Sequence, residues 1–89
     1  MRANVVFHGR VQGVYFRATC RQDAIGRGLL GWVRNRRDGA VEAVFEGDQE
    51  VVEAAIEWNR TSQPYAKVSH VEVAWSDASA EFETFQVRH

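Results

Sequence analysis

Residues 9–17 combine two residue types that suit an anion-binding site, flexible glycines and an arginine. Gly9 and Gly13 lie four residues apart, at the junction of an expected strand and an expected helix. Glycine permits positive φ angles and lets a ligand approach the backbone closely. Successive amides in such a turn can converge on an anion, and the following helix adds the positive end of its dipole. The spacing therefore favours a tetrahedral anion such as phosphate.

Arg17 falls in the first turn of the expected helix, close to the same loop. Its planar guanidinium can hold two phosphate oxygens at once, and it stays charged at any working pH. However, a G-x-x-x-G spacing also arises by chance, and an arginine in a first helical turn often faces only water. The loop and the arginine indicate an anion site without specifying its reaction.

The formal net charge of −1 hides a strong asymmetry along the chain. Residues 1–37 hold eight arginines and one acid, whereas residues 38–89 hold three basic residues and eleven acids, which gives +7 and −8. A basic first half suits an anion site, although most of its arginines are expected to be solvated surface residues. Arg34, Arg36 and Arg37 are interpreted as an electrostatic background, and Arg10 as the nearer contributor at the loop.

Hydrophobic periodicity and turn signals divide the chain into alternating elements. Asp38-Gly39 is a strong signal for a two-residue hairpin turn, and Asp48 is a plausible helix N-cap. The order βαββαβ, with a short final strand, predicts an α+β ferredoxin-like sandwich. We expect an antiparallel sheet of four to five strands with two helices on one face. The expected elements are strands at 3–8, 32–36, 40–46, 68–75 and 82–87, and helices at 16–26 and 48–59.

The length of 89 residues predicts one domain spanning 1–89. No apolar run approaches the roughly 20 residues that span a bilayer, so we expect no membrane partner. The one cysteine, Cys20, fits a cytoplasmic location. Cys20 and Arg27 resemble the Cys-x5-Arg loop of cysteine phosphatases, but six residues separate them. Cys20 is therefore interpreted as a buried apolar residue and not as a nucleophile. His8 is expected to point outward from the first strand. His70 and His89 lack partners at ligand spacing, so no metal site is predicted.

The sequence carries two motifs that resemble the two signatures of the acylphosphatase family. The first is Gly9-x-Val11-Gln12-Gly13-Val14-x-Phe16-Arg17, and the second is Gly31-Trp32-Val33-Arg34-Asn35-Arg36-Arg37-Asp38-Gly39. They occur in the family's order and at its spacing, and the resemblance covers essentially the whole chain. Two positions outside the signatures depart from the family pattern, namely Arg27 in the first helix and Gln63, which precedes Pro64.

The resemblance implies hydrolysis of acyl phosphates to a carboxylate and inorganic phosphate, with no metal and no cofactor. Arg17 corresponds to the catalytic arginine that binds the phosphoryl group, and Asn35 to the catalytic asparagine that orients the attacking water. Asparagine cannot act as a base at neutral pH, so the proton of the water is expected to pass to a phosphate oxygen of the substrate. The residues implied to bind the phosphoryl group are Val11, Gln12, Gly13, Val14, Tyr15, Phe16 and Arg17.

Two other function classes remain as alternatives. A non-catalytic anion-binding or regulatory module of the same fold would bind phosphate without turnover. An RNA-binding domain shares the element order but displays aromatic residues on its third strand. Residues 40–46 instead offer two glutamates and one phenylalanine, an acidic surface that would repel a phosphate backbone. We therefore expect no nucleic-acid partner. The expected ligand is a small acyl phosphate, and the expected oligomeric state is a monomer.

Overall fold

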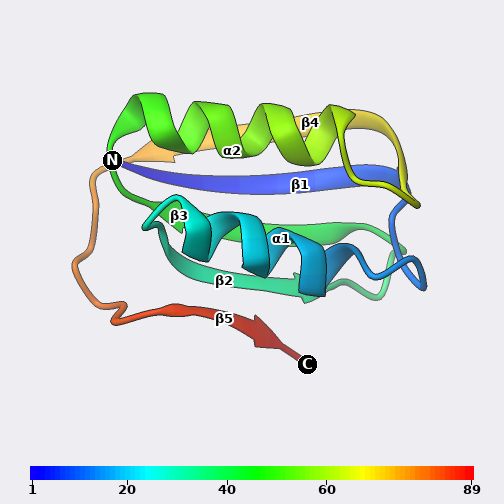
Figure 1. Cartoon of the computed structure of the whole chain (residues 1–89), viewed down its shortest axis with the longest axis horizontal. Coiled ribbons are helices and arrows are strands. Elements are labelled where there is room, and N and C mark those ends of the chain that lie inside the picture. The colour runs from blue at the N-terminus through cyan, green and yellow to red at the C-terminus, as the bar shows by residue number, and fades with distance from the viewer.

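The computed structural model describes all 89 residues and shows two helices packed on one face of a single five-stranded sheet (Figure 1). Neither helix has the length and apolar composition that a membrane-spanning segment requires. The predicted βαββαβ order and the short final strand are confirmed. The elements are β1 (Arg2–Arg10), α1 (Phe16–Gly26), β2 (Leu30–Asn35), β3 (Val41–Glu46), α2 (Gln49–Thr61), β4 (Lys67–Ser76) and β5 (Phe85–Arg88).

The strand order across the sheet is β4-β1-β3-β2-β5. Neighbouring strands are antiparallel except for β2 and β5, which pair in parallel from Gly31 opposite Phe85 to Arg34 opposite Arg88. The expectation of a wholly antiparallel sheet was therefore wrong in this detail. The segment after β4 passes around one end of the sheet to its opposite edge (Figure 1), so β5 starts at the same end as β2 and runs in the same direction.

The core lies between the helices and the facing side of the sheet. Alternation along β1 places Ala3, Val5 and Phe7 in this layer, as expected for a strand with one buried face. The spacing of Phe16, Cys20 and Ala24 gives α1 its buried stripe, which confirms the sequence-based interpretation of this helix. The opposite face of the sheet carries no helix (Figure 1). The remaining core residues include Val33, Val41, Ala43, Phe45, Val52, Ala55 and Phe85.

The β2–β3 connection is a three-residue loop and not the predicted two-residue turn. The N–H of Arg36 donates to the Ala40 carbonyl at 2.8 Å, which leaves residues 37–39 as the loop. A two-residue type I′ turn needs positive φ at both central positions, but only Gly39 adopts it here, at 93°. Asp38 instead accepts a hydrogen bond from the N–H of Ala40, which holds the pKa of Asp38 below its ordinary value. This loop lies at the end of the sheet where the β1–α1 loop begins (Figure 1).

Candidate active site

The β1–α1 loop, residues 11–15, leaves a run of backbone amides without partners. Gly13 and Tyr15 both adopt left-handed φ angles, 72° and 61°. No N–H from Val11 to Tyr15 donates a hydrogen bond to a carbonyl of the protein. Alternation of left- and right-handed residues turns successive N–H groups toward one concavity, a conformation that binds anions. These free amides suit an anion, and the anion loop between β1 and α1 stays a prediction.

The first turn of α1 adds further free donors beside the loop. Tyr15 is the N-cap residue and makes no side-chain capping bond, and the first turn holds no acidic residue. The first backbone N–H groups of any α-helix lack intrahelical partners, and here no side chain satisfies them. These amides and the positive end of the helix dipole favour an anion at this point.

Gly9 sets the direction in which the chain enters the loop. A β-bulge lies between His8 and Gly9, and Gly9 has a φ of 121°. A Cβ at this position would lie 2.3 Å from the carbonyl oxygen of Lys67 in β4. Only glycine fits such a close approach between the two strands. The first signature glycine therefore positions the strand instead of giving a ligand access to the backbone.

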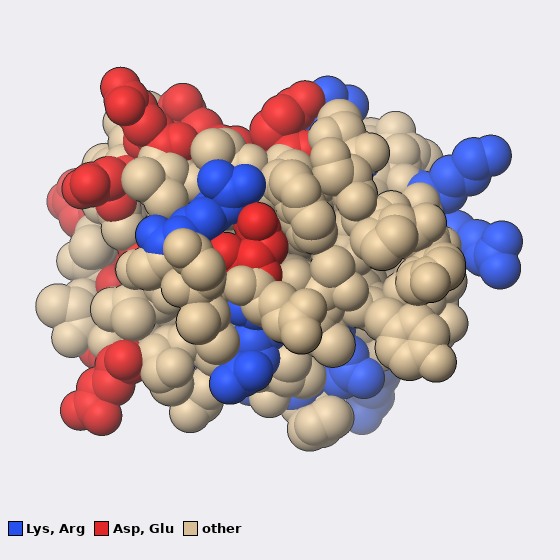
Figure 2. Space-filling view, in the orientation of Figure 1, with Lys and Arg blue, Asp and Glu red and all other residues tan.

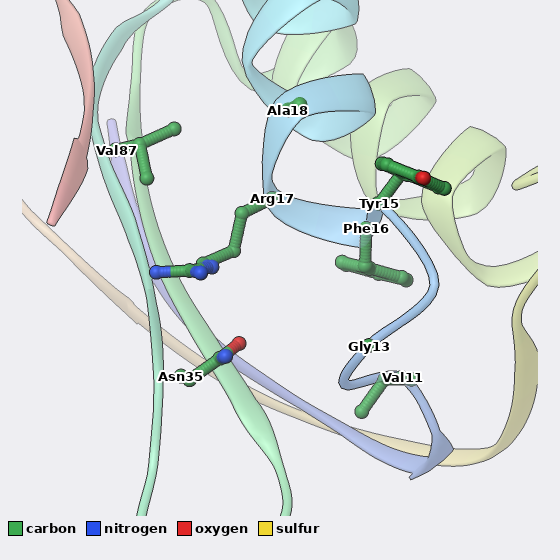
Figure 3. Close-up of a pocket in the computed structure, with 8 residues that line it drawn as sticks. All are labelled: Val11, Gly13, Tyr15, Phe16, Arg17, Ala18, Asn35 and Val87. Atoms are coloured by element: carbon green, nitrogen blue, oxygen red, sulfur yellow. The ribbon is translucent and has the colours of Figure 1, made fainter. Parts of the chain in front are cut away.

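A cavity of about 400 Å³ opens between the loop, α1, β2 and β5. In Figure 3 the side chains of Arg17 and Asn35 reach toward each other across this cavity from α1 and β2. The lining contains no aspartate, glutamate, histidine or cysteine, so it offers no set of ligands for a metal ion. The residues that line it are Val11, Gly13, Tyr15, Phe16, Arg17, Ala18, Asn35 and Val87.

Arg17 has no acidic partner in the structure. One terminal nitrogen donates to the carbonyl oxygen of Arg88 at 3.2 Å and lies 3.3 Å from Nδ1 of His89. No carboxylate forms an ion pair with Arg17. Arg88 at the end of β5 and His89 after it thus orient the guanidinium without neutralising it, and its charge remains available to an anion.

Asn35 occupies the last position of β2, with its side chain on the same face as buried Val33. It is half-buried, and its side-chain amide makes no hydrogen bond within the protein. A half-buried amide without a partner, aimed into a cavity, is ready to bind a ligand or a water molecule. The neighbouring arginines are occupied elsewhere, because Arg34 pairs with Glu42 at 2.7 Å and Arg36 pairs with Asp38 at 3.0 Å.

Gln12 ties the loop to the β2–β3 turn. Its side-chain nitrogen donates to the carbonyl oxygens of Arg36 at 2.7 Å and Ala40 at 2.9 Å. The side chain therefore points away from the cavity, although its backbone N–H remains free. These two bonds hold the β1–α1 loop against the end of the strand that carries Asn35.

Gln63, which follows α2, holds Phe16, the first residue of α1, by a side-chain hydrogen bond. The side-chain nitrogen of Gln63 donates to the Phe16 carbonyl at 3.0 Å and to Oδ1 of Asn59 at 2.9 Å. Gln63 is buried, and its Oε1 has no partner. The departure from the family pattern at this position thus supplies a side-chain contact to the start of α1.

The structure gathers most of the predicted site residues and separates a few. Arg17 and Asn35 meet at the cavity, whereas the side chains of Gln12 and Val14 do not line it, and Val14 packs into the core. Ala18 and Val87 line the cavity but were not predicted. Ala18 could have been inferred from its place in the first helical turn. Val87 gave no local signal, because the parallel pairing of β5 brings it to the site.

Cys20 is excluded as a nucleophile. It is fully buried on α1, and burial raises the pKa of its thiol far above the ordinary value. Arg27, the suggested partner, pairs with Asp23 at 2.9 Å. The interpretation of Cys20 as a buried apolar residue is confirmed.

The surface charge is polarised along the long axis of the molecule. Figure 2 shows acidic side chains gathered at the end where α2 begins, and basic side chains projecting from the end that carries the β1–α1 loop. Because a basic surface raises the local concentration of anions, this arrangement favours approach of an anionic ligand to the cavity. The charge asymmetry of the sequence thus becomes a spatial one.

Comparison with known proteins agrees with this architecture. The family Acylphosphatase matches residues 3–87. A curated acylphosphatase from Pelotomaculum thermopropionicum is 51% identical over 86 residues, which cover 97% of this chain and 94% of that protein. The crystal structure of acylphosphatase from Bacillus subtilis matches with a TM-score of 0.94 and 33% identity, covering 99% of this chain and 98% of the other. An acylphosphatase from Coxiella burnetii matches with a TM-score of 0.83 and 36% identity, covering 98% and 90%. On the residues of the site, the fold and these similarities, the chain belongs to the acylphosphatase family.

Proposed function

We propose that this protein hydrolyses the carboxyl–phosphate bond of acyl phosphates and releases a carboxylate and inorganic phosphate. One observation carries the proposal: an unpaired arginine and an unpartnered asparagine face one cavity beside a loop of free amides. A site with that composition binds a phosphoryl group and leaves one polar side chain free for a water molecule. The family to which the chain belongs supports the same activity.

The loop and Arg17 bind the phosphoryl group in this proposal. The amides from Val11 to Phe16 donate to its oxygens, and the guanidinium of Arg17 adds charge-assisted bonds. Phosphoryl transfer depends chiefly on positioning and on stabilising charge at the equatorial oxygens, which are the contributions these groups make. The carbonyl of Arg88 orients the guanidinium before substrate arrives.

Asn35 positions the attacking water. The lining of the cavity holds no carboxylate or imidazole that could act as a general base. A carboxylate is a good leaving group, so strong general acid catalysis is not required. The proton of the water passes to a phosphate oxygen of the substrate, and the reaction uses neither a metal nor a cofactor.

We further propose a single-domain cytoplasmic monomer with no nucleic-acid partner. The proposed reaction uses only groups of one chain, so it requires no second copy. The one cysteine is buried and free, as suits a reducing compartment. The bare face of the sheet presents Glu42 and Glu72, which disfavour a phosphate backbone. Size-exclusion chromatography with light scattering tests the oligomeric state.

Hydrolysis of benzoyl phosphate by purified, chelator-treated protein is the direct test. Arg17→Ala removes at least two charge-assisted hydrogen bonds of about 1.5–3 kcal/mol each, so kcat/KM should fall at least roughly a hundredfold. Arg37→Ala is the matched control, because Arg37 is exposed and outside the cavity. Full activity of Arg17→Ala would overturn the role of this residue.

Asn35→Ala separates water positioning from phosphate binding. We expect a large fall in kcat with the inhibition constant for inorganic phosphate nearly unchanged, whereas Asn4→Ala, on the opposite face of the sheet, should match the wild type. A comparable loss of phosphate binding would reassign Asn35 as a phosphate ligand. Tight phosphate binding by the wild-type protein with no turnover would instead indicate a non-catalytic module.

A further inference from the structure

Three side chains that the proposed reaction does not use form a cluster on the bare face of the sheet. His8 of β1 lies directly opposite His70 of β4 in the strand register, and Glu72 follows two residues later on the same face. The two imidazole rings stack with centroids 4.2 Å apart and planes 5° from parallel. Nε2 of His8 lies 2.6 Å from Oε2 of Glu72. The outward orientation expected for His8 is confirmed, and strand pairing supplies the partner that His70 lacked along the chain.

We propose that His8, His70 and Glu72 form a binding site for a divalent transition-metal ion of the Zn²⁺ type, separate from the catalytic cavity. The donor atoms of these residues all lie within 4.8 Å of one another. Two imidazoles and one carboxylate are a donor set that Zn²⁺ binds tetrahedrally, with one position left for water. Magnesium and calcium prefer a shell of oxygen atoms, so this composition selects against them.

The backbone holds the three ligands in place before a metal arrives. His8 and His70 form a cross-strand pair, whose Cβ atoms a sheet keeps about 4.5–5.5 Å apart. Ligands of a tetrahedral zinc site lie about 3.4 Å from one another, given metal–ligand distances near 2.1 Å. The donor atoms now lie within 4.8 Å of one another, so metal binding would require rotation of these partly exposed side chains to bring them to that spacing. The metal ion then replaces the proton between His8 and Glu72.

The charges around the cluster allow a cation to bind. Arg36 is the basic side chain near Glu72, and it forms an ion pair with Asp38 at 3.0 Å. Nε2 of His8 lies 2.6 Å from Oε2 of Glu72, so the carboxylate already faces one of the two imidazoles. A glutamate side chain ordinarily carries its charge at neutral pH, as a metal ligand must.

Metal binding at this position would connect β1 and β4 close to the start of the β1–α1 loop. His8 immediately precedes the bulge at Gly9, and β4 supplies the carbonyl of Lys67 that packs against Gly9. A metal ion bound across these strands would stabilise the sheet at the entrance to the loop. The site goes beyond the proposed hydrolase function and takes no part in the reaction.

Titration of tag-free, chelator-treated protein with Zn²⁺ tests the proposal by isothermal calorimetry. We expect one site of micromolar affinity, and a rise in Tm of about 5 °C or more when Zn²⁺ exceeds the dissociation constant at least tenfold. His8→Asn and His70→Asn should each weaken binding at least about tenfold and remove the rise in Tm. His89→Asn, which changes the remaining histidine, should leave both measurements unchanged.

Circular dichroism without metal confirms that each variant folds, which is expected because these side chains lie outside the core. Titration with Co²⁺ should give the intense visible absorption of a tetrahedral site, and this band should disappear in His8→Asn. Absence of Zn²⁺ binding at millimolar metal would overturn the proposal. Equal affinity of the wild type and the His8→Asn, His70→Asn double variant would also overturn it. Because none of these readouts depends on turnover, this test is independent of the hydrolase assay.

Discussion

Replacing Gln12 with alanine removes the side chain that connects the anion loop to the β2–β3 turn. In the wild type its nitrogen donates to the carbonyl oxygens of Arg36 and Ala40. Asn35 immediately precedes that turn, so the two bonds set the position of the asparagine relative to the loop amides. We expect Gln12→Ala to lower both the free energy of unfolding and kcat.

The magnitude follows from what the two carbonyl groups retain after the substitution. The Arg36 carbonyl still accepts a bond from the N–H of Gly39 at 3.3 Å, and the Ala40 carbonyl still accepts one from the N–H of Arg36 at 2.8 Å. Neither acceptor is left without a partner, so the loss is two neutral hydrogen bonds without a desolvation penalty, about 1–2 kcal/mol in total. This corresponds to a fall in Tm of about 5–15 °C.

The effect on catalysis should exceed the effect on phosphate binding. If the positional freedom gained by Asn35 raises the activation free energy by the same amount, about 1–2 kcal/mol, kcat falls roughly five- to thirtyfold. The loop amides keep their own conformation, which Gly13 and the start of α1 impose locally, so the inhibition constant for phosphate should change less than threefold or so. Urea unfolding, turnover of benzoyl phosphate and phosphate inhibition measure the three quantities.

Two further variants test whether the effect comes from the hydrogen bonds of Gln12. Gln12→Glu keeps the shape but directs an ionised carboxylate at two carbonyl oxygens, so it should be less stable and less active than Gln12→Ala. Gln22→Ala is the matched control, because Gln22 is exposed on α1 and makes no hydrogen bond with its side chain. Wild-type kcat in a folded Gln12→Ala protein would refute the positioning role. A loss of phosphate affinity as large as the loss of kcat would also refute it.

Three other substitutions test the structure that supports the site. Gly9→Ala should destabilise the protein by several kcal/mol in urea unfolding, because the new Cβ would lie 2.3 Å from the Lys67 carbonyl oxygen and φ is strained. Gln63→Leu should cost about 1–3 kcal/mol by the same measurement, because the buried Oδ1 of Asn59 and the Phe16 carbonyl both lose a side-chain donor. Burial alone would raise the pKa of Glu46, but hydrogen bonds and an ion pair bring it below its ordinary value. The resulting stability is present above the unfolded pKa of about 4.3 and is lost as the pH falls through the lower folded pKa, so Glu46→Gln should flatten Tm against pH in that acidic range.

The sequence alone determined the features that depend on residues close together in the chain. The helical spacing of Phe16, Cys20 and Ala24 identified α1 and its buried face, because an amphipathic helix repeats every 3.6 residues. The glycines and Arg17 indicated the candidate anion loop, since a strand–loop–helix junction is a local arrangement. The two signature motifs indicated the family and the candidate role of Asn35. The alternation along β2 was enough to place Asn35 and Val33 on the same face.

Only the tertiary structure decided which distant segments complete the site. Val87 lines the cavity and the carbonyl of Arg88 orients Arg17 because β5 crosses to the far edge of the sheet and pairs in parallel with β2. The bonds of Gln12 and the approach of His8 to His70 likewise depend on which strands become neighbours. Periodicity reveals which face of a strand is buried, but not which strand lies beside it, because pairing depends on the register and the path of the whole chain.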